Sequence, residues 1–168
     1  MLKPYNVFCD MDGVVANFFD TAFRLTGKRW DDPIYVQKHA REARDEMIKK
    51  HLDFAHLPPM PDFEQLWNFI KHFDPDILTA FARWDPEGST RGKVEWNHKY
   101  LHVPANKFHV VSRRNKQFFA KGHDGKPNLL IDDYSANIDE WKAKGGVGIL
   151  HKNARDTIAQ MKQLGYAL

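Results

Sequence analysis

Hydrophobic residues alternate between two patterns along the chain. Short apolar runs of strand length recur at residues 6–9, 76–78, 108–111, 128–131 and 147–150. Segments with apolar residues at helical spacing separate these runs. Strands that alternate with helices in this way are typical of a parallel sheet covered by helices. The pattern therefore predicts an α/β fold with a Rossmann-like parallel sheet.

Two segments have the clearest helical spacing. The first begins at Asp62, an expected N-cap with Gln65 three residues further on. Its apolar positions are Phe63, Leu66, Trp67, Ile70 and Phe73. The second lies behind Asn153 and has apolar residues at Ala154, Ile158, Met161 and Leu164. Both helices are expected to cover the sheet.

Residues 17–61 interrupt the alternation, because a long segment with helical patterns and no convincing strand follows the first strand. One narrow apolar stripe in it is expected to be the buried face of an amphipathic helix. The stripe consists of Val36, Ala40, Ala43 and Met47, and the charged residues expected to face water are Lys38, Arg41, Glu42, Arg44, Asp45 and Glu46. We therefore predict a core of residues 1–16 and 62–168, with residues 17–61 inserted as a helical cap.

Composition and charge narrow the function classes. No apolar run approaches the roughly 20 residues that span a bilayer, so no membrane partner is expected. The N-terminus lacks the features of a signal peptide, which predicts a cytoplasmic location. The formal net charge of +3 is much weaker than the basic face of a dedicated nucleic-acid binder, so no stable nucleic-acid complex is expected.

Two further features are expected to be structural. Cys9 is the only cysteine, which excludes an internal disulfide, and it is expected to fill a buried strand. A run of basic residues in the second half of the chain is expected to face solvent, as most charge runs do. It consists of Arg113, Arg114, Lys116, Lys121 and Lys126.

Two carboxylates stand directly after the first predicted strand. Asp10 and Asp12 can converge on one centre there, because residues i and i+2 of an extended chain point the same way. Gly13 would let the chain turn sharply away at the end of the sheet where parallel strands open onto a ligand crevice. A calcium loop needs glycine at its sixth position and glutamate at its twelfth, whereas glycine is fourth here. A polar turn and a paired-carboxylate site stay open as alternatives.

Four short elements, in this order, resemble the motifs of the haloacid dehalogenase superfamily. The matching residues are Asp10, Asp12 and Gly13 for the first motif, Thr79 for the second, Lys93 for the third, and Asp132 and Asp133 for the fourth. Lys93 is expected to open a helix that runs from Gly92 to Leu101. Each element alone is weak, since a single threonine or lysine is commonplace, but the set covers nearly the whole chain. The resemblance implies a haloacid dehalogenase-like fold and a Mg²⁺-dependent phosphatase.

Within that superfamily, the chain is most similar to the 5′(3′)-deoxyribonucleotidases. The similar stretches are residues 10–18, 93–100 and 130–133, together with the segment around Phe54. Where that family often has serine after the second-motif threonine, this chain has Ala80, which can offer only its backbone amide. The resemblance implies a small-molecule phosphomonoester substrate, specifically a nucleoside monophosphate.

The resemblance also implies roles for the acids and the phosphate ligands. Asp10 would be the nucleophile and Asp12 the general acid and base, while Asp10, the Asp12 backbone carbonyl and Asp133 would hold Mg²⁺. Asp132 would orient Lys93. The groups expected to bind phosphate are Thr79, Ala80, Lys93 and, from its place at a strand end, Arg113. Arg113 has the alternative of pairing with a local acid.

Three aromatic residues of the predicted cap are candidates for contact with a nucleobase. Phe18, Trp30 and Phe54 offer flat surfaces for stacking, with packing of the cap onto the core as the alternative, above all for Trp30. His98 and His102 have i, i+4 spacing but lack the further ligands of a zinc helix.

Several functions stay open at this point. A polynucleotide 3′-phosphatase and a sugar-phosphate phosphatase would use the same residues, and a non-catalytic binding module would keep the fold. The intact set of acids, threonine and lysine argues against the last of these. The sequence does not distinguish base or sugar preference, 5′ from 3′ phosphate, or a monomer from a homodimer.

Overall fold

A computed structural model describes all residues, 1–168, and its centre is a five-stranded parallel sheet. The strands are β1 (Val7–Cys9), β2 (Asp76–Ala80), β3 (Phe108–Val111), β4 (Leu129–Asp132) and β5 (Val147–Leu150). They lie in the order β3-β2-β1-β4-β5, so β1 is central and pairs with β2 and β4. The predicted α/β fold is confirmed.

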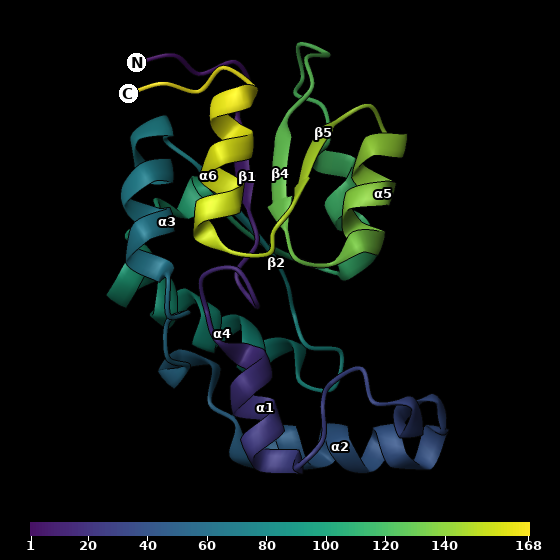
Figure 1. The fold of residues 1–168 in the computed structure, drawn as a ribbon. Helices are drawn as coiled ribbons and strands as arrows, with labels where there is room; N and C mark the ends of the chain where they lie inside the picture. Colours follow the sequence, from purple (N-terminus) through teal and green to yellow (C-terminus); the bar gives the residue numbers. More distant parts are fainter.

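Both faces of the sheet are buried, as expected for parallel strands. Val7 and Cys9 pack into the larger hydrophobic cluster, together with Met161 of α6 (Ala154–Gln163). Phe8 points to the opposite face and joins a second cluster with Trp141 of α5 (Ser135–Ala143). Figure 1 shows α3 and α6 beside one another and α5 on the other side of the sheet.

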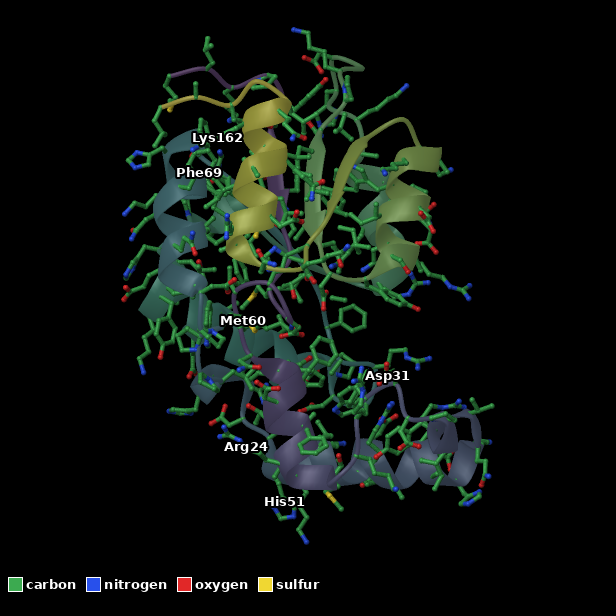
Figure 2. The ribbon with its side chains drawn as sticks, in the orientation of Figure 1. Arg24, Asp31, His51, Met60, Phe69 and Lys162 are labelled. Carbon is green, nitrogen blue, oxygen red and sulfur yellow. The ribbon has the colours of Figure 1, made fainter.

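Helix α3 (Phe63–Ile70) and the short turn η3 (Lys71–Phe73) bury all five predicted apolar positions. The carboxylate of Asp62 does not cap its own helix but accepts a hydrogen bond from the Ala154 backbone N–H, 2.6 Å away at the start of α6. At the other end of this helix pair, the ammonium group of Lys162 lies 5.8 Å from the centroid of the Phe69 ring (Figure 2). The two helices are thus joined by polar as well as apolar contacts.

Residues 17–61 contain only helices and loops. These helices are α1 (Phe18–Thr26), η1 (Pro33–Val36), α2 (Lys38–His51) and η2 (Phe54–His56). Figure 1 shows α1 and α2 beyond the end of the sheet that is remote from the two chain termini. The chain segments that precede and follow these helices are hydrogen-bonded to one another. Asn17 N–H donates to Pro58 O, and Met60 N–H donates to Val15 O, both at 2.8 Å. Met60 marks this junction in Figure 2.

The predicted buried stripe of α2 is wrong. Val36 is 83% exposed and Met47 41%, whereas Arg44 and Ile48 are buried. Arg44 can be buried because its guanidinium lies 3.6 Å from the centroid of the Trp30 ring and pairs with Asp45. The helix therefore packs through a face that includes a charged residue.

Helix α4 (Pro86–Trp96) begins well before the predicted start at Gly92, and a π-turn (Asn97–Leu101) continues it. The Asp85 side chain caps it by accepting from Gly88 N–H, and Pro86 occupies its first turn. Lys93 therefore lies in the interior of the helix and does not open it. The remaining short helices are η5 (Ala105–Lys107) and η6 (Arg113–Phe119). No helix of the chain is both long and apolar enough to cross a membrane.

Candidate active site

Three carboxylates meet where β1 and β4 end. Asp10 follows β1, Asp132 is the last residue of β4, and Asp133 follows it. Each can offer an oxygen atom, and the three atoms lie within 4.8 Å of one another. Asp10 and Asp132 are buried, and β1 and β4 are hydrogen-bonded neighbours, so sheet pairing alone brings the first and fourth motifs together.

Lys116 is the counter-ion of this cluster. Its ammonium group lies 2.8 Å from Asp10 Oδ1 and 2.9 Å from Asp132 Oδ2. Burial acts to lower the pKa of Lys116, but the two carboxylates outweigh burial and raise that pKa above its ordinary value. The expectation that Lys116 faces solvent with its basic neighbours is wrong, because it is only 3% exposed. Its place just after β3, at the same edge of the sheet, was the signal that could have found it.

One lysine does not neutralise three crowded acids. Burial, and then the charge of Asp132, raises the pKa of Asp10 to about 7. Burial, followed by the charges of Asp10 and Asp132, raises the pKa of Asp133 to about 8. A cluster of hard oxygen donors that resists ionisation is suited to a divalent cation, which would restore the charged forms. The residues present therefore fit Mg²⁺.

The two adjacent acids of β4 have different surroundings. Asp132 Oδ1 accepts from the Tyr134 backbone N–H at 2.9 Å, and its Oδ2 accepts from Lys116 and from Asn137 Nδ2. No donor of the chain reaches the Asp133 carboxylate. A β-carbon built on Gly13, which has φ of +81°, would lie 2.1 Å from Asp133 Oδ2, so only glycine leaves this carboxylate its place.

Lys93 does not contact Asp132, its expected partner. Its ammonium group donates to Asp12 Oδ2 at 2.7 Å and to Thr79 Oγ1 at 2.8 Å, and it is 1% exposed. The expectation that Asp132 orients Lys93 is therefore wrong, because the partner of Asp132 is Lys116. The second carboxylate oxygen of Asp12, Oδ1, is buried and has no hydrogen-bond partner.

The other expected phosphate ligands lie at neighbouring strand ends. Thr79 is buried and Ala80 is the last residue of β2. Arg113 follows β3 and donates to Asn137 Oδ1 at 2.9 Å and to Glu140 Oε2 at 3.2 Å, the local pairing named as its alternative. A phosphate contact for Thr79, Ala80, Lys93 and Arg113 stays a prediction.

The three aromatic candidates are packed against one another. Phe18 and Phe54 are 5% and 7% exposed, and their rings are stacked with centroids 5.8 Å apart. Trp30 meets Phe18 edge-on at 4.9 Å. Phe54 approaches the site most directly, since the Lys93 ammonium group lies 5.3 Å from its ring centroid. Phe18 and Phe54 thus offer little free ring surface.

Comparison with known proteins gives no match to a protein-family model and none to a curated protein. Solved structures do match over most of both chains. A hydrolase from Streptococcus pneumoniae TIGR4 has a TM-score of 0.57 and 14% identity, covering 96% of this chain and all of that one. A haloacid dehalogenase family hydrolase from Deinococcus radiodurans R1, with bound phosphate and sodium, has a TM-score of 0.51 and 13% identity, covering 98% and 90%.

A protein from Thermotoga maritima provisionally named a beta-phosphoglucomutase has a TM-score of 0.54 and 12% identity, covering 95% of this chain and 99% of that one. The chain has the fold of the haloacid dehalogenase-like hydrolases. At these identities the likeness concerns the fold alone, because one fold hosts many functions. It agrees with the superfamily resemblance and says nothing about the deoxyribonucleotidase subfamily.

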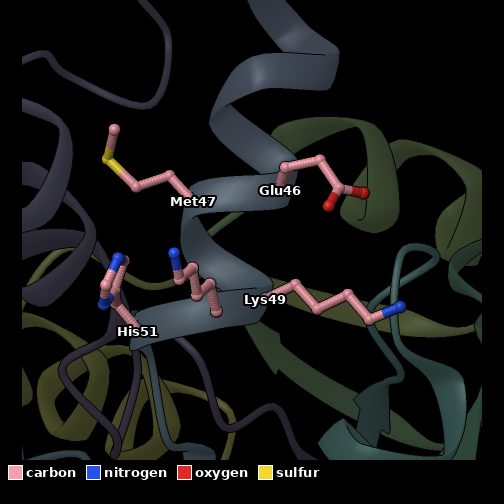
Figure 3. A pocket seen from close by; sticks show the side chains of 5 residues that line it. Glu46, Met47, Lys49 and His51 are labelled. Atoms are coloured by element: carbon pink, nitrogen blue, oxygen red, sulfur yellow. The ribbon is translucent and has the colours of Figure 1, made fainter.

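In an open parallel α/β sheet, ligands bind in the crevice at the carboxyl ends of the strands. Figure 3 shows a different hollow, lined by Glu46, Met47, Lys49, Lys50 and His51 at the end of α2. All five residues come from one helix, α2, and His51 lies at the far end of the molecule from the sheet in Figure 2. The candidate site therefore remains the acid cluster around Asp10.

Proposed function

We propose that the protein is a Mg²⁺-dependent phosphomonoester hydrolase that forms an aspartyl phosphate at Asp10 and acts on nucleoside monophosphates. The observation that carries this proposal is the unequal use of the clustered carboxylates. Asp132 is fully engaged with Lys116, Asn137 and a backbone amide, whereas Asp133 accepts no hydrogen bond beside Asp10. That division provides a fixed counter-ion for the nucleophile and a free ligand for a cation.

Asp10, Asp133 and the backbone carbonyl of Asp12 would hold Mg²⁺. When bound, the ion supplies positive charge that offsets the repulsion between the carboxylates and a phosphate dianion. Lys116 holds Asp10 by Oδ1, which leaves Oδ2 as the attacking atom. A nucleophile held at one oxygen by a buried charge pair loses little orientational freedom on attack.

The proposed reaction has two balanced steps. Asp10 Oδ2 bonds to phosphorus as the bond from phosphorus to the leaving oxygen breaks, and Asp12 gives that oxygen a proton. Ionised Asp12 then takes a proton from water, whose oxygen displaces Asp10 and releases inorganic phosphate. Asp12 suits this role because Lys93 holds its Oδ2 while Oδ1 has no partner and can carry the proton.

The nucleotide substrate rests on the subfamily resemblance and on the aromatic residues between the cap, residues 17–61, and the site. A sugar-phosphate phosphatase is the second candidate, because the Thermotoga maritima structure is named for an enzyme of phosphorylated sugars. A cap over the site would favour either small substrate over a polynucleotide 3′ end.

A substrate panel tests the proposal. Nucleoside 5′- and 3′-monophosphates, sugar phosphates and a 3′-phosphorylated oligonucleotide are assayed for phosphate release with Mg²⁺ and with chelator. We expect Mg²⁺-dependent release that is fastest from a nucleoside monophosphate and absent in Asp10→Asn. Faster release from a sugar phosphate would favour the second candidate, and no release from any ester would favour a binding module.

A further inference from the structure

Phe19, a residue without a role in the site described above, lies beside the acid cluster. A β-carbon built on Gly13 would meet Phe19 Cε2 at 2.8 Å and Asp133 Oδ2 at 2.1 Å, so the ring edge and the carboxylate border the same small space. Phe19 is 37% exposed, in contrast to its neighbour Phe18 at 5%. Phe19 is therefore an aromatic ring with free surface next to the carboxylates.

Phe19 belongs to a row of partly exposed rings that joins the cap to the core. Its centroid lies 6.4 Å from Trp30, and Trp30 lies 5.7 Å from Trp84 in the loop between β2 and α4. Trp30 and Trp84 are both intermediate in exposure. The fully buried pair of Phe18 and Phe54 lies behind this row, with Trp30 edge-on to Phe18.

Trp84 adds a polar group that the chain itself leaves without a partner. Its indole N–H is buried and has no hydrogen-bond acceptor. A buried donor without an acceptor is destabilising, so buried indole groups normally have an acceptor. Because this N–H has no free surface, an acceptor reaches it only when Trp84 shifts against its neighbours. A ligand that enters between cap and core can supply that acceptor.

We infer that Phe19 and Trp84 bind the leaving group of the substrate, and that the part of this group they contact is an aromatic heterocycle carrying a hydrogen-bond acceptor. Phe19 offers an apolar ring surface for stacking, and the Trp84 N–H matches a ring carbonyl or ring nitrogen. A nucleobase has both properties, whereas a sugar has no π face. The inference rests on the proposed function and assigns its base contacts to residues other than the buried Phe18 and Phe54.

Two substrates and three variants test this inference. The substrates are deoxythymidine 5′-monophosphate and deoxyribose 5-phosphate, which is a nucleotide without its base. The variants are Phe19→Ala, Trp84→Phe, which keeps a ring but removes the N–H, and Phe23→Ala as the control. Phe23 lies one turn further along α1 and is 49% exposed.

We expect Phe19→Ala to raise the KM for the nucleotide by about fivefold to a hundredfold, the range of base stacking on one aromatic side chain. Trp84→Phe should raise it by about twofold to tenfold, the range of one neutral hydrogen bond. Neither variant should change kinetics with deoxyribose 5-phosphate, and Phe23→Ala should change neither substrate. Because the Trp84 N–H has no partner, Trp84→Phe loses no hydrogen bond, and a fall in its melting temperature would reflect only the smaller ring.

The outcomes separate the inference from the proposed function. If the wild-type enzyme prefers the nucleotide but neither Phe19→Ala nor Trp84→Phe alters its KM, the inference is overturned and the nucleotidase proposal stands. If these variants raise the KM equally for both substrates, the two rings have only a packing role and the inference is again overturned. A wild-type enzyme that uses deoxyribose 5-phosphate as well as the nucleotide would overturn the nucleotide substrate itself.

Discussion

The ammonium group of Lys116 lies 2.8 Å from Asp10 Oδ1, although the two residues are 106 positions apart in the chain. Both side chains are buried, and the same ammonium group also contacts Asp132. A buried carboxylate is tolerated only when it is paired, so this contact couples the stability of the core to the chemistry of the site. It also fixes which oxygen of Asp10 is free to react.

Removal of this counter-ion should be costly. Lys116→Met leaves Asp10 and Asp132 buried beside one another without a positive charge, and loss of one partner from a buried ion pair typically costs about 3–5 kcal/mol. We expect the free energy of unfolding in urea to fall by that order, with loss of phosphatase activity. Lys126→Met is the control, because the Lys126 side chain is 82% exposed. Equal stability of the two variants would contradict the assigned role of Lys116.

Asp10→Asn should abolish turnover while the fold is retained. The substitution removes the attacking charge at nearly constant side-chain volume. Burial raises the pKa of Asp10 to about 7. Ionisation of Asp10 above that pH therefore lowers the free energy of unfolding of the wild type. Since asparagine stays neutral, the variant should be no less stable than wild type at about pH 8. Circular dichroism and phosphate release measure the two effects. A variant that keeps more than a trace of the wild-type rate would exclude Asp10 as nucleophile.

Asp12→Asn should slow turnover by about a hundredfold to ten-thousandfold, the usual contribution of general acid–base catalysis. The amide can still accept from Lys93 but cannot give its proton to the leaving oxygen. The loss in kcat/KM, which reports the steps up to formation of the aspartyl phosphate, should therefore be smaller for an ester of an acidic phenol, whose leaving oxygen needs no proton. Equal losses for alkyl and phenyl esters would argue against Asp12 as the acid.

The stability of the metal-free protein should depend on the charge of Asp133. Its pKa rises from 3.8 to about 8 in the folded chain, so between those values the folded state binds more protons than the unfolded state. The free energy of unfolding contributed by Asp133 should therefore fall as the pH rises from about 4 to about 8. Wild type in chelator should lose stability across this range relative to Asp133→Asn.

Mg²⁺ should stabilise wild type most at the upper end of this range, because the ion binds the ionised carboxylates. The comparison with Asp133→Asn removes the contribution of other groups, including His151, whose pKa burial lowers. Parallel pH profiles of the two proteins in chelator would contradict the assignment of Asp133 as a free, crowded ligand.

The core of the fold was predictable because the three inner strands, β2, β1 and β4, are short apolar runs buried on both faces. It was likewise predictable that residues at the carboxyl ends of β1, β2 and β4 lie near one another, since parallel strands present these ends at one edge. Lys116 was missed because the basic run was interpreted as a whole, although the position of Lys116 after β3 places it at the same edge of the sheet as Asp10 and Asp132. Its burial depends on contacts over a long sequence separation.

The helices α2 and α4 were the least predictable elements. The apolar stripe of α2 had helical spacing, but the helix buries Arg44 through contacts with Trp30 that no periodicity reveals. The start of α4 was placed too late because the pattern of Asp85 and Pro86 as cap and first turn was not recognised. That error put Lys93 at the start of a helix that in fact begins at Pro86.

Direct detection of a phosphorylated Asp10 tests the central claim. The fastest substrate of the panel, labelled with ³²P, is mixed with enzyme and Mg²⁺ for less than one turnover, quenched in acid and digested. The account predicts label on the peptide that contains Asp10, loss of that label when unlabelled substrate follows, and none in Asp10→Asn. Phosphate release by an active enzyme that never carries label on Asp10 would contradict it.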